Sequence, residues 1–73
     1  MRVTIEIDGY VSDTGLEYVP QVGDEVELTA GILAVTGQAV IPEPYIGHRY
    51  LVTGRRWKRE RETLCQVELK RLP

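Results

Sequence analysis

The chain has few of the residues on which most chemistry depends. It contains one cysteine, Cys65, and one histidine, His48. A single cysteine closes no intrachain disulfide, and neither residue has neighbours at the paired Cys or His spacing of a zinc site. With no convergent pair of acids beside them, these residues offer too few catalytic groups. We therefore expect a protein that is not an enzyme and that needs no cofactor or metal.

Long hydrophobic runs are missing as well. The start of the chain alternates apolar with polar residues instead of forming the apolar core of a signal peptide, and no later run approaches membrane-spanning length. We expect a cytoplasmic protein without a membrane partner. Because 73 residues leave no room for a second core, residues 1–73 should form a single small β-barrel domain.

Alternation of apolar and polar residues is the clearest pattern present. "RVTIEID" (2–8) places Val3, Ile5 and Ile7 on one face, which predicts a half-buried strand. "GYVSDTG" (9–15) supplies turn residues and predicts a loop, followed by a short extended piece, "LEYVP" (16–20). A Gly-Asp turn then precedes a second strand, in which Val26 and Leu28 alternate with polar residues.

The middle of the chain is harder to assign. Residues 32–41, "ILAVTGQAVI", fit a hairpin turning at Thr36-Gly37 or one irregular strand, and we favour two short extended pieces. "PEPYIG" (42–47) must be a loop, because two prolines remove backbone donors from any sheet.

The last third reads as a hairpin. "HRYLVTGRRW" (48–57) and "TLCQVELKRL" (63–72) are its strands, joined through residues 59–62. Gly54 interrupts the alternation where a bulge would turn Trp57 toward the face of Tyr50 and Val52. In the second strand, alternation buries Cys65 as an inert thiol. A helix over residues 55–64 is the alternative, but its apolar stripe would be too thin to anchor it.

Five or six short strands without a convincing helix predict an all-β fold, either a small strongly bent sheet or an SH3-like barrel. "VPQVGDEVEL" (19–28), followed by "YLVTGRRW" (50–57) and "CQVELKRL" (65–72), resembles small SH3-like barrels, including accessory β-proteins of bacterial and phage genomes. The resemblance implies a fold and carries no catalytic residue.

Charge is divided between the two parts of the chain. Residues 1–48 hold one basic and eight acidic residues, a net of −7, whereas residues 49–73 hold eight basic and three acidic residues, a net of +5, which together give −2. "GRRWKRERE" (54–62) alone contains five of the nine Lys and Arg residues, around the only Trp.

Two hypotheses explain this basic stretch. In the favoured one, Trp57 is at least partly buried and the arginines pair with acidic strands of the same chain or of a second copy. In the alternative, an exposed Trp stacks on bases of single-stranded nucleic acid while cations contact phosphates. The surface for this alternative comprises Arg55, Arg56, Trp57, Lys58, Arg59 and Arg61.

The proline-containing segment "PEPYIGHRY" (42–50) offers a different surface. Tyr45, Ile46 and Tyr50 form a candidate patch for a protein partner, although they would also serve to close one end of a barrel. Glu25 and Glu27 near Asp24 fit a solvated strand face and a turn better than a metal site. We therefore expect a non-enzymatic protein-interaction or assembly module, with self-association or a protein partner, and nucleic-acid binding as the alternative function.

Overall fold

The computed structural model describes residues 1–33, 41–59 and 61–73. The described chain is mostly strand, with two short helical turns. In chain order the elements are β1 (Arg2–Ile7), β2 (Tyr10–Asp13), β3 (Glu25–Glu27), α1 (Ala30–Leu33), the 3-10 turn η2 (Glu43–Tyr45), β4 (Arg49–Arg59) and β5 (Thr63–Arg71).

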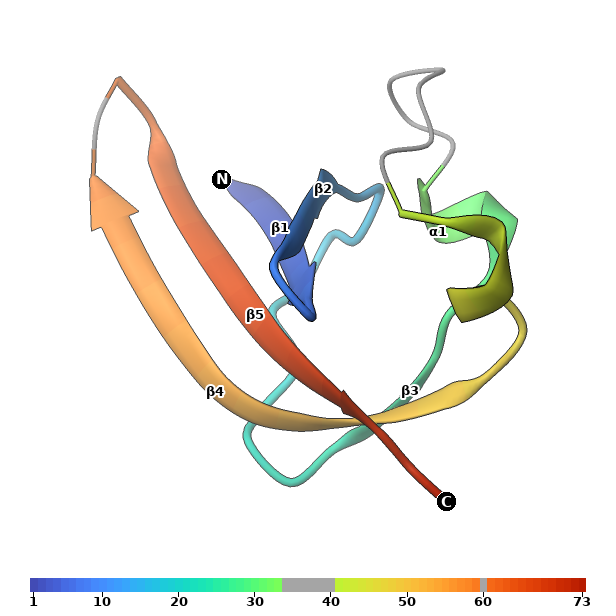
Figure 1. The fold of residues 1–73 in the computed structure, drawn as a ribbon. Helices are drawn as coiled ribbons and strands as arrows, with labels where there is room; N and C mark the ends of the chain where they lie inside the picture. Colours follow the sequence, from blue (N-terminus) through green and yellow to red (C-terminus); the bar gives the residue numbers. More distant parts are fainter. Residues whose placement is uncertain (34–40, 60) are drawn as a thin grey trace.

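The strands form one sheet with the order β2-β1-β5-β4-β3. β1 and β5 run parallel, and the other neighbours run antiparallel. The sheet is strongly bent, and β4 curves along most of its length (Figure 1). In the described part of the chain β2 and β3 are its edges. The all-β prediction of a bent sheet is confirmed, whereas a closed SH3-like barrel does not form among these residues.

The first strand follows its sequence pattern. Val3, Ile5 and Ile7 are at most 2% exposed, because alternation directs all three to the inner side of the bend. Together with residues of the C-terminal hairpin and three residues from the segment between β3 and η2, they build one core. Its members are Val3, Ile5, Ile7, Leu28, Leu33, Ile41, Tyr50, Val52, Cys65, Val67 and Leu69.

The prediction of a loop after the first strand was wrong. The chain turns within two residues, Asp8 and Gly9, and continues as β2 alongside β1. Both turn residues have positive φ, 51° and 88°, which matches the right-handed twist of the flanking strands and is why Asp-Gly favours tight hairpins. The Gly9 N–H also donates to the Glu6 carboxylate at 3.0 Å. Residues 16–20, expected to be extended, form no strand.

The extended structure expected from residue 32 onward is also wrong where the structure describes it. Residues 30–33 form the single turn α1, in which the Ile32 N–H lies 3.2 Å from the Thr29 carbonyl oxygen and 3.4 Å from the Thr29 hydroxyl. Threonine at the start of a helical turn supplies this kind of cap. Residues 34–40, including Thr36-Gly37, lie outside the described residues.

The C-terminal hairpin is confirmed, and the helix considered for residues 55–64 is wrong. β4 and β5 pair from Tyr50 opposite Arg71 to Arg59 opposite Thr63. The register shifts between Val52 and Gly54, at the position where a bulge was predicted. Gly54 suits this position because a Cβ there would lie 3.3 Å from the Glu68 carboxylate.

One buried group on the outer face of β1 is unsatisfied. Thr4 is 5% exposed, and its hydroxyl is the only buried side-chain polar atom of the described chain without a hydrogen-bond partner. Leaving such a group unpaired costs about 1–3 kcal/mol. We predict that Thr4→Val, which keeps the shape, raises the free energy of unfolding by about 1 kcal/mol in urea titrations. Thr4→Ser retains the hydroxyl and should give no gain; equal stabilisation by both would contradict the explanation.

Candidate nucleic-acid interface

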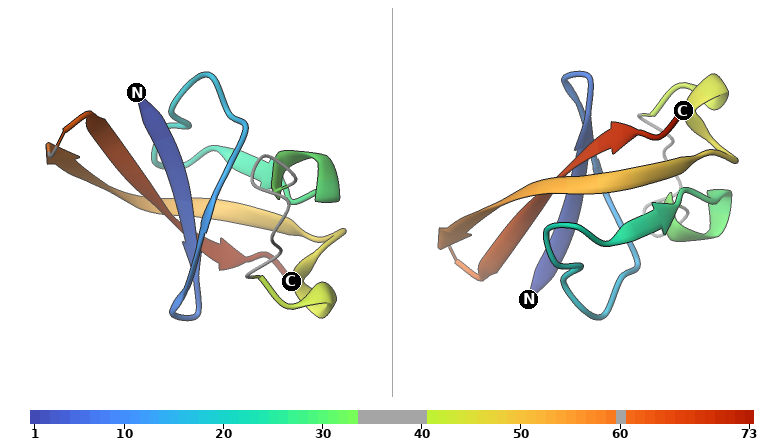
Figure 2. Two further views of the ribbon diagram at one scale, coloured as in Figure 1. Left: turned by 90° about the horizontal axis from the view of Figure 1, so that it is seen from above. Right: turned by 90° about the horizontal axis from the view of Figure 1, so that it is seen from below.

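The distal half of the β4–β5 hairpin, toward Arg59 and Thr63, extends beyond β3 (Figure 1, Figure 2). On one side, β1 lies beside β5 from Leu64 to Glu68. On the other side, β3 lies beside β4 only from Arg49 to Leu51. Among the described strands, the basic segment of β4 therefore has β5 as its only neighbour.

The register assigns each basic side chain to a face. Directly opposed residues of an antiparallel pair share a face. Arg55 lies opposite Val67 and Trp57 opposite Cys65, so both are on the core side, and alternation adds Arg59. Arg56 and Lys58 point to the other side. The core side of this segment thus presents one aromatic ring between two guanidinium groups.

Trp57 is half-exposed, so it is partly buried but does not belong to the core. The bulge does turn it to the face that bears the core, yet the side chain remains 52% exposed. Its opposite residue, Cys65, is fully buried beside Val3 of β1. β4, however, is the outermost strand at this level of the sheet. No described strand lies beyond it to cover the outer part of the ring.

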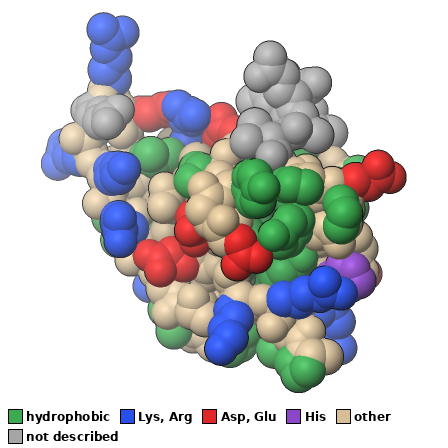
Figure 3. Space-filling model, in the orientation of Figure 1, with side chains coloured by type: hydrophobic (Ala, Val, Ile, Leu, Met, Phe, Trp, Pro, Cys, Tyr) green, Lys and Arg blue, Asp and Glu red, His purple; other side chains and the backbone are tan. Residues whose placement is uncertain are grey.

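The expected pairing of the hairpin arginines with acidic strands is also wrong within this chain. Arg56 pairs with Glu68 of the same hairpin at 3.7 Å, and the acidic strand β3 uses Glu25 to pair with Arg49 instead. The other cations of the segment form no ion pair with any carboxylate that the structure describes; they are Arg55, Lys58, Arg59 and Arg61. Lys and Arg side chains accordingly line the hairpin side of the molecule (Figure 3).

The candidate protein-binding patch is mostly part of the core. Tyr50 is fully buried, and its hydroxyl donates to the Tyr45 carbonyl oxygen at 2.6 Å. Tyr45 and Ile46 are half-buried and pack against the core, while Glu43 stays exposed. The Tyr45 hydroxyl donates to Asp8 at 3.0 Å, and its ring meets the Tyr10 ring edge-on. Tyr50 is therefore a core residue, whereas Tyr45 and Ile46 keep part of their surface exposed at this end of the fold.

The tyrosine pKa values reflect this packing. The hydrogen bond to Asp8 raises the pKa of Tyr45, because it stabilises the protonated phenol. Burial raises the pKa of Tyr50. Neither change favours a reactive phenolate.

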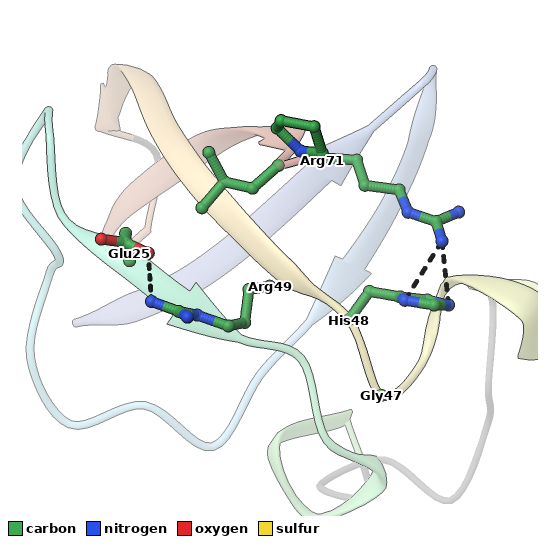
Figure 4. Close-up of a pocket in the computed structure, with 7 residues that line it drawn as sticks. Glu25, Gly47, His48, Arg49 and Arg71 are labelled. Atoms are coloured by element: carbon green, nitrogen blue, oxygen red, sulfur yellow. Dashed lines mark hydrogen bonds and ion pairs between the residues drawn. The ribbon is translucent and has the colours of Figure 1, made fainter.

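A surface cavity of about 530 Å³ lies at the other end of β4 (Figure 4). Its charged side chains already have partners. Arg49 pairs with Glu25, and Nη2 of Arg71 lies 3.1 and 3.2 Å from the two ring nitrogens of His48.

Glu25 and Glu27 are exposed, and the Asp24 carboxylate accepts from the Gln21 N–H, which confirms a solvated strand face preceded by a turn. Among residues 1–33, 41–59 and 61–73, no group of three His, Cys, Asp or Glu residues is arranged to hold a metal.

Cys65 does not provide a nucleophile. Its side chain is fully buried, and burial raises the pKa of the thiol, with Arg55 opposing the effect to a smaller degree. The reactive thiolate is therefore disfavoured as well as inaccessible.

No family model, curated protein or solved structure matches the chain. Within its described residues, no helix has the length and apolar character needed to span a membrane.

Proposed function

We propose that the protein binds single-stranded nucleic acid on the core-side face of the distal β4–β5 hairpin. The observation that carries the proposal is the half-exposed Trp57 between Arg55 and Arg59. A base stacks on the indole, and the two guanidinium groups contact phosphates on either side. A cytoplasmic location, expected from the sequence, suits such a ligand.

The spacing of the three residues fits this role. Arg55 and Arg59 are four positions apart in one strand, which corresponds to about 13 Å between their backbones, with Trp57 midway. Arginine side chains are long enough to reach the backbone of a strand whose base lies on the ring. Stacking tolerates any base, so we expect little sequence preference.

The test is a titration of the protein with a labelled oligothymidylate at low salt. Trp57 is the only tryptophan, so we expect its emission to report a water-exposed ring that is quenched on binding. If the two guanidinium groups contact phosphates, the logarithm of the binding constant should fall with the logarithm of salt concentration with a slope of about −1.4.

Polyglutamate is the matched control, because it offers negative charge without bases. It should compete weakly and leave Trp57 emission unchanged. No oligonucleotide binding at low salt, or equal quenching by both polymers, would exclude the stacking site.

A further inference from the structure

The edge of the sheet is formed by β3 along one part of β4 and by β4 itself along the rest. β3 lies beside Arg49–Leu51, and the turn before it reaches Val52: the Gly23 N–H donates to the Val52 carbonyl and the Val52 N–H donates to the Asp24 carbonyl, both at 2.9 Å. From Gly54 to Arg59, β4 pairs only with β5 among the described strands. Beyond β3 the edge is therefore set back by the width of one strand, about 4.8 Å. We call this recess the notch.

The ladder determines which backbone groups face the notch. Residues of an antiparallel strand direct their N–H and C=O groups alternately to the two neighbours, and Val52 directs both toward β3. Thr53 is the extra residue of the bulge and has no opposite residue in β5. The backbone groups of Gly54 therefore face Glu68 of β5, and from there the backbone groups again alternate between the two sides of the strand. Arg55, Trp57 and Arg59 then point their backbone groups into the notch. Unpaired groups of this kind are a template for another strand.

The outer edge of β3 presents matching groups. The Leu28 N–H donates to the His48 carbonyl oxygen at 3.0 Å, and the Asp24 carbonyl also faces β4. By alternation, Glu25 and Glu27 direct their backbone groups outward. In a pair of parallel strands, a residue forms backbone hydrogen bonds with the two residues that precede and follow the residue opposite it. Trp57 lying opposite Val26 would therefore bond to Glu25 and Glu27.

The side chains agree with this pairing. Val26 lies opposite Tyr50, hence on the core side, where it would meet Trp57. Glu25 and Glu27 lie on the other side, where they would meet Arg56 and Lys58. Pairing of two β4 edges with each other would instead place cations opposite cations, which is unfavourable.

We propose that a second copy of the chain fills the notch. In this homodimer, β3 of each copy pairs in parallel with the distal part of β4 of the other copy, around a two-fold axis perpendicular to the sheet. Such an axis reverses strand direction, and β3 runs antiparallel to its own β4, so it runs parallel to the β4 of the second copy. Each chain contributes the acidic strand and the basic notch once, which makes the interface self-complementary. The dimer goes beyond nucleic-acid binding and does not depend on it.

Charge reversal tests this pairing by sedimentation equilibrium. Neither Glu27 nor Lys58 forms an ion pair within the described chain, so Glu27→Lys and Lys58→Glu leave the known ion pairs intact. In a dimer of either variant, positions 27 and 58 carry charges of the same sign at both of their contacts. Each variant should therefore dimerise at least about tenfold more weakly at low salt. In an equimolar mixture, Lys at position 27 meets Glu at position 58 while the other half of the interface is unchanged. The mixture should therefore dimerise about as well as the unmodified protein.

Amide hydrogen exchange gives a second readout. The N–H groups of Arg55, Trp57 and Arg59 should exchange slowly in the dimer and quickly in the Lys58→Glu monomer, whereas those of Arg56 and Lys58 stay protected by β5 in both. A protein that remains monomeric at every accessible concentration, or variants that do not associate when mixed, would overturn the proposal. That failure would leave the nucleic-acid proposal intact, because the stacking site consists of side chains from one chain.

Discussion

Replacing Trp57 by alanine is expected to weaken oligonucleotide binding about 5-fold to 150-fold, since base stacking on an aromatic side chain contributes about 1–3 kcal/mol. The loss should be largely independent of salt, because no cation is removed. Arg55→Ala or Arg59→Ala should instead reduce the salt slope by about 0.7 each. Fluorescence anisotropy of a labelled oligothymidylate at several salt concentrations separates these two effects.

Two further variants make the Trp57 result specific. Trp57→Phe keeps a stacking ring and should retain most of the affinity. Tyr18→Ala removes another exposed aromatic side chain, 65% exposed in the connection between β2 and β3, and should have no effect on binding. If Trp57→Ala bound as well as the unmodified protein while Arg59→Ala did not, the hairpin would be a purely electrostatic site.

Ile5→Ala is expected to lower the free energy of unfolding by about 2–5 kcal/mol, as is usual for truncation of a fully buried isoleucine. Ile5 is 2% exposed and lies between Ser12 of β2 and Val67 of β5. Its side chain cannot be replaced by a neighbour, because the strands on both sides are fixed by the sheet. Urea unfolding followed by far-UV circular dichroism measures the change.

Val11→Ala is the matched control for this truncation. Val11 is on the adjacent strand β2 and is 43% exposed, so its truncation should change stability by no more than about 0.5 kcal/mol. Losses of similar size at the two positions would show that β2 contributes to a core on both faces.

The elements that sequence alone predicted are those defined by neighbouring residues. Alternation in residues 2–8 located β1 and its buried face, and the interruption at Gly54 located the bulge. The missed strand β2 had a local signal as well, because Asp8-Gly9 is typical of a two-residue hairpin turn. The further turn residues of this segment, up to Gly15, obscure that signal because together they fit one longer loop.

The properties that sequence did not predict depend on where the core ends. Alternation places Trp57 and Cys65 on one face, but it does not show that β4 lacks an outer neighbour beside Trp57 while β5 is covered by β1 beside Cys65. For the same reason the sequence does not show that Tyr50, a member of the candidate surface patch, is fully buried. The strand order, which joins the two ends of the chain, determines both outcomes.

The parallel pairing of β1 with β5 has a consequence for how the molecule is made. Arg2 lies opposite Leu64 and Glu6 opposite Glu68, so the central pair of the sheet joins the two ends of the chain. Contacts between residues far apart in sequence slow folding, because a long loop must close before they form. β1 can pair locally with β2, which follows it after a two-residue turn, but its pairing with β5 requires the whole intervening segment. Folding is therefore expected to begin in the two local hairpins, β1–β2 and β4–β5, and to finish when the parallel pairing of β1 with β5 joins them.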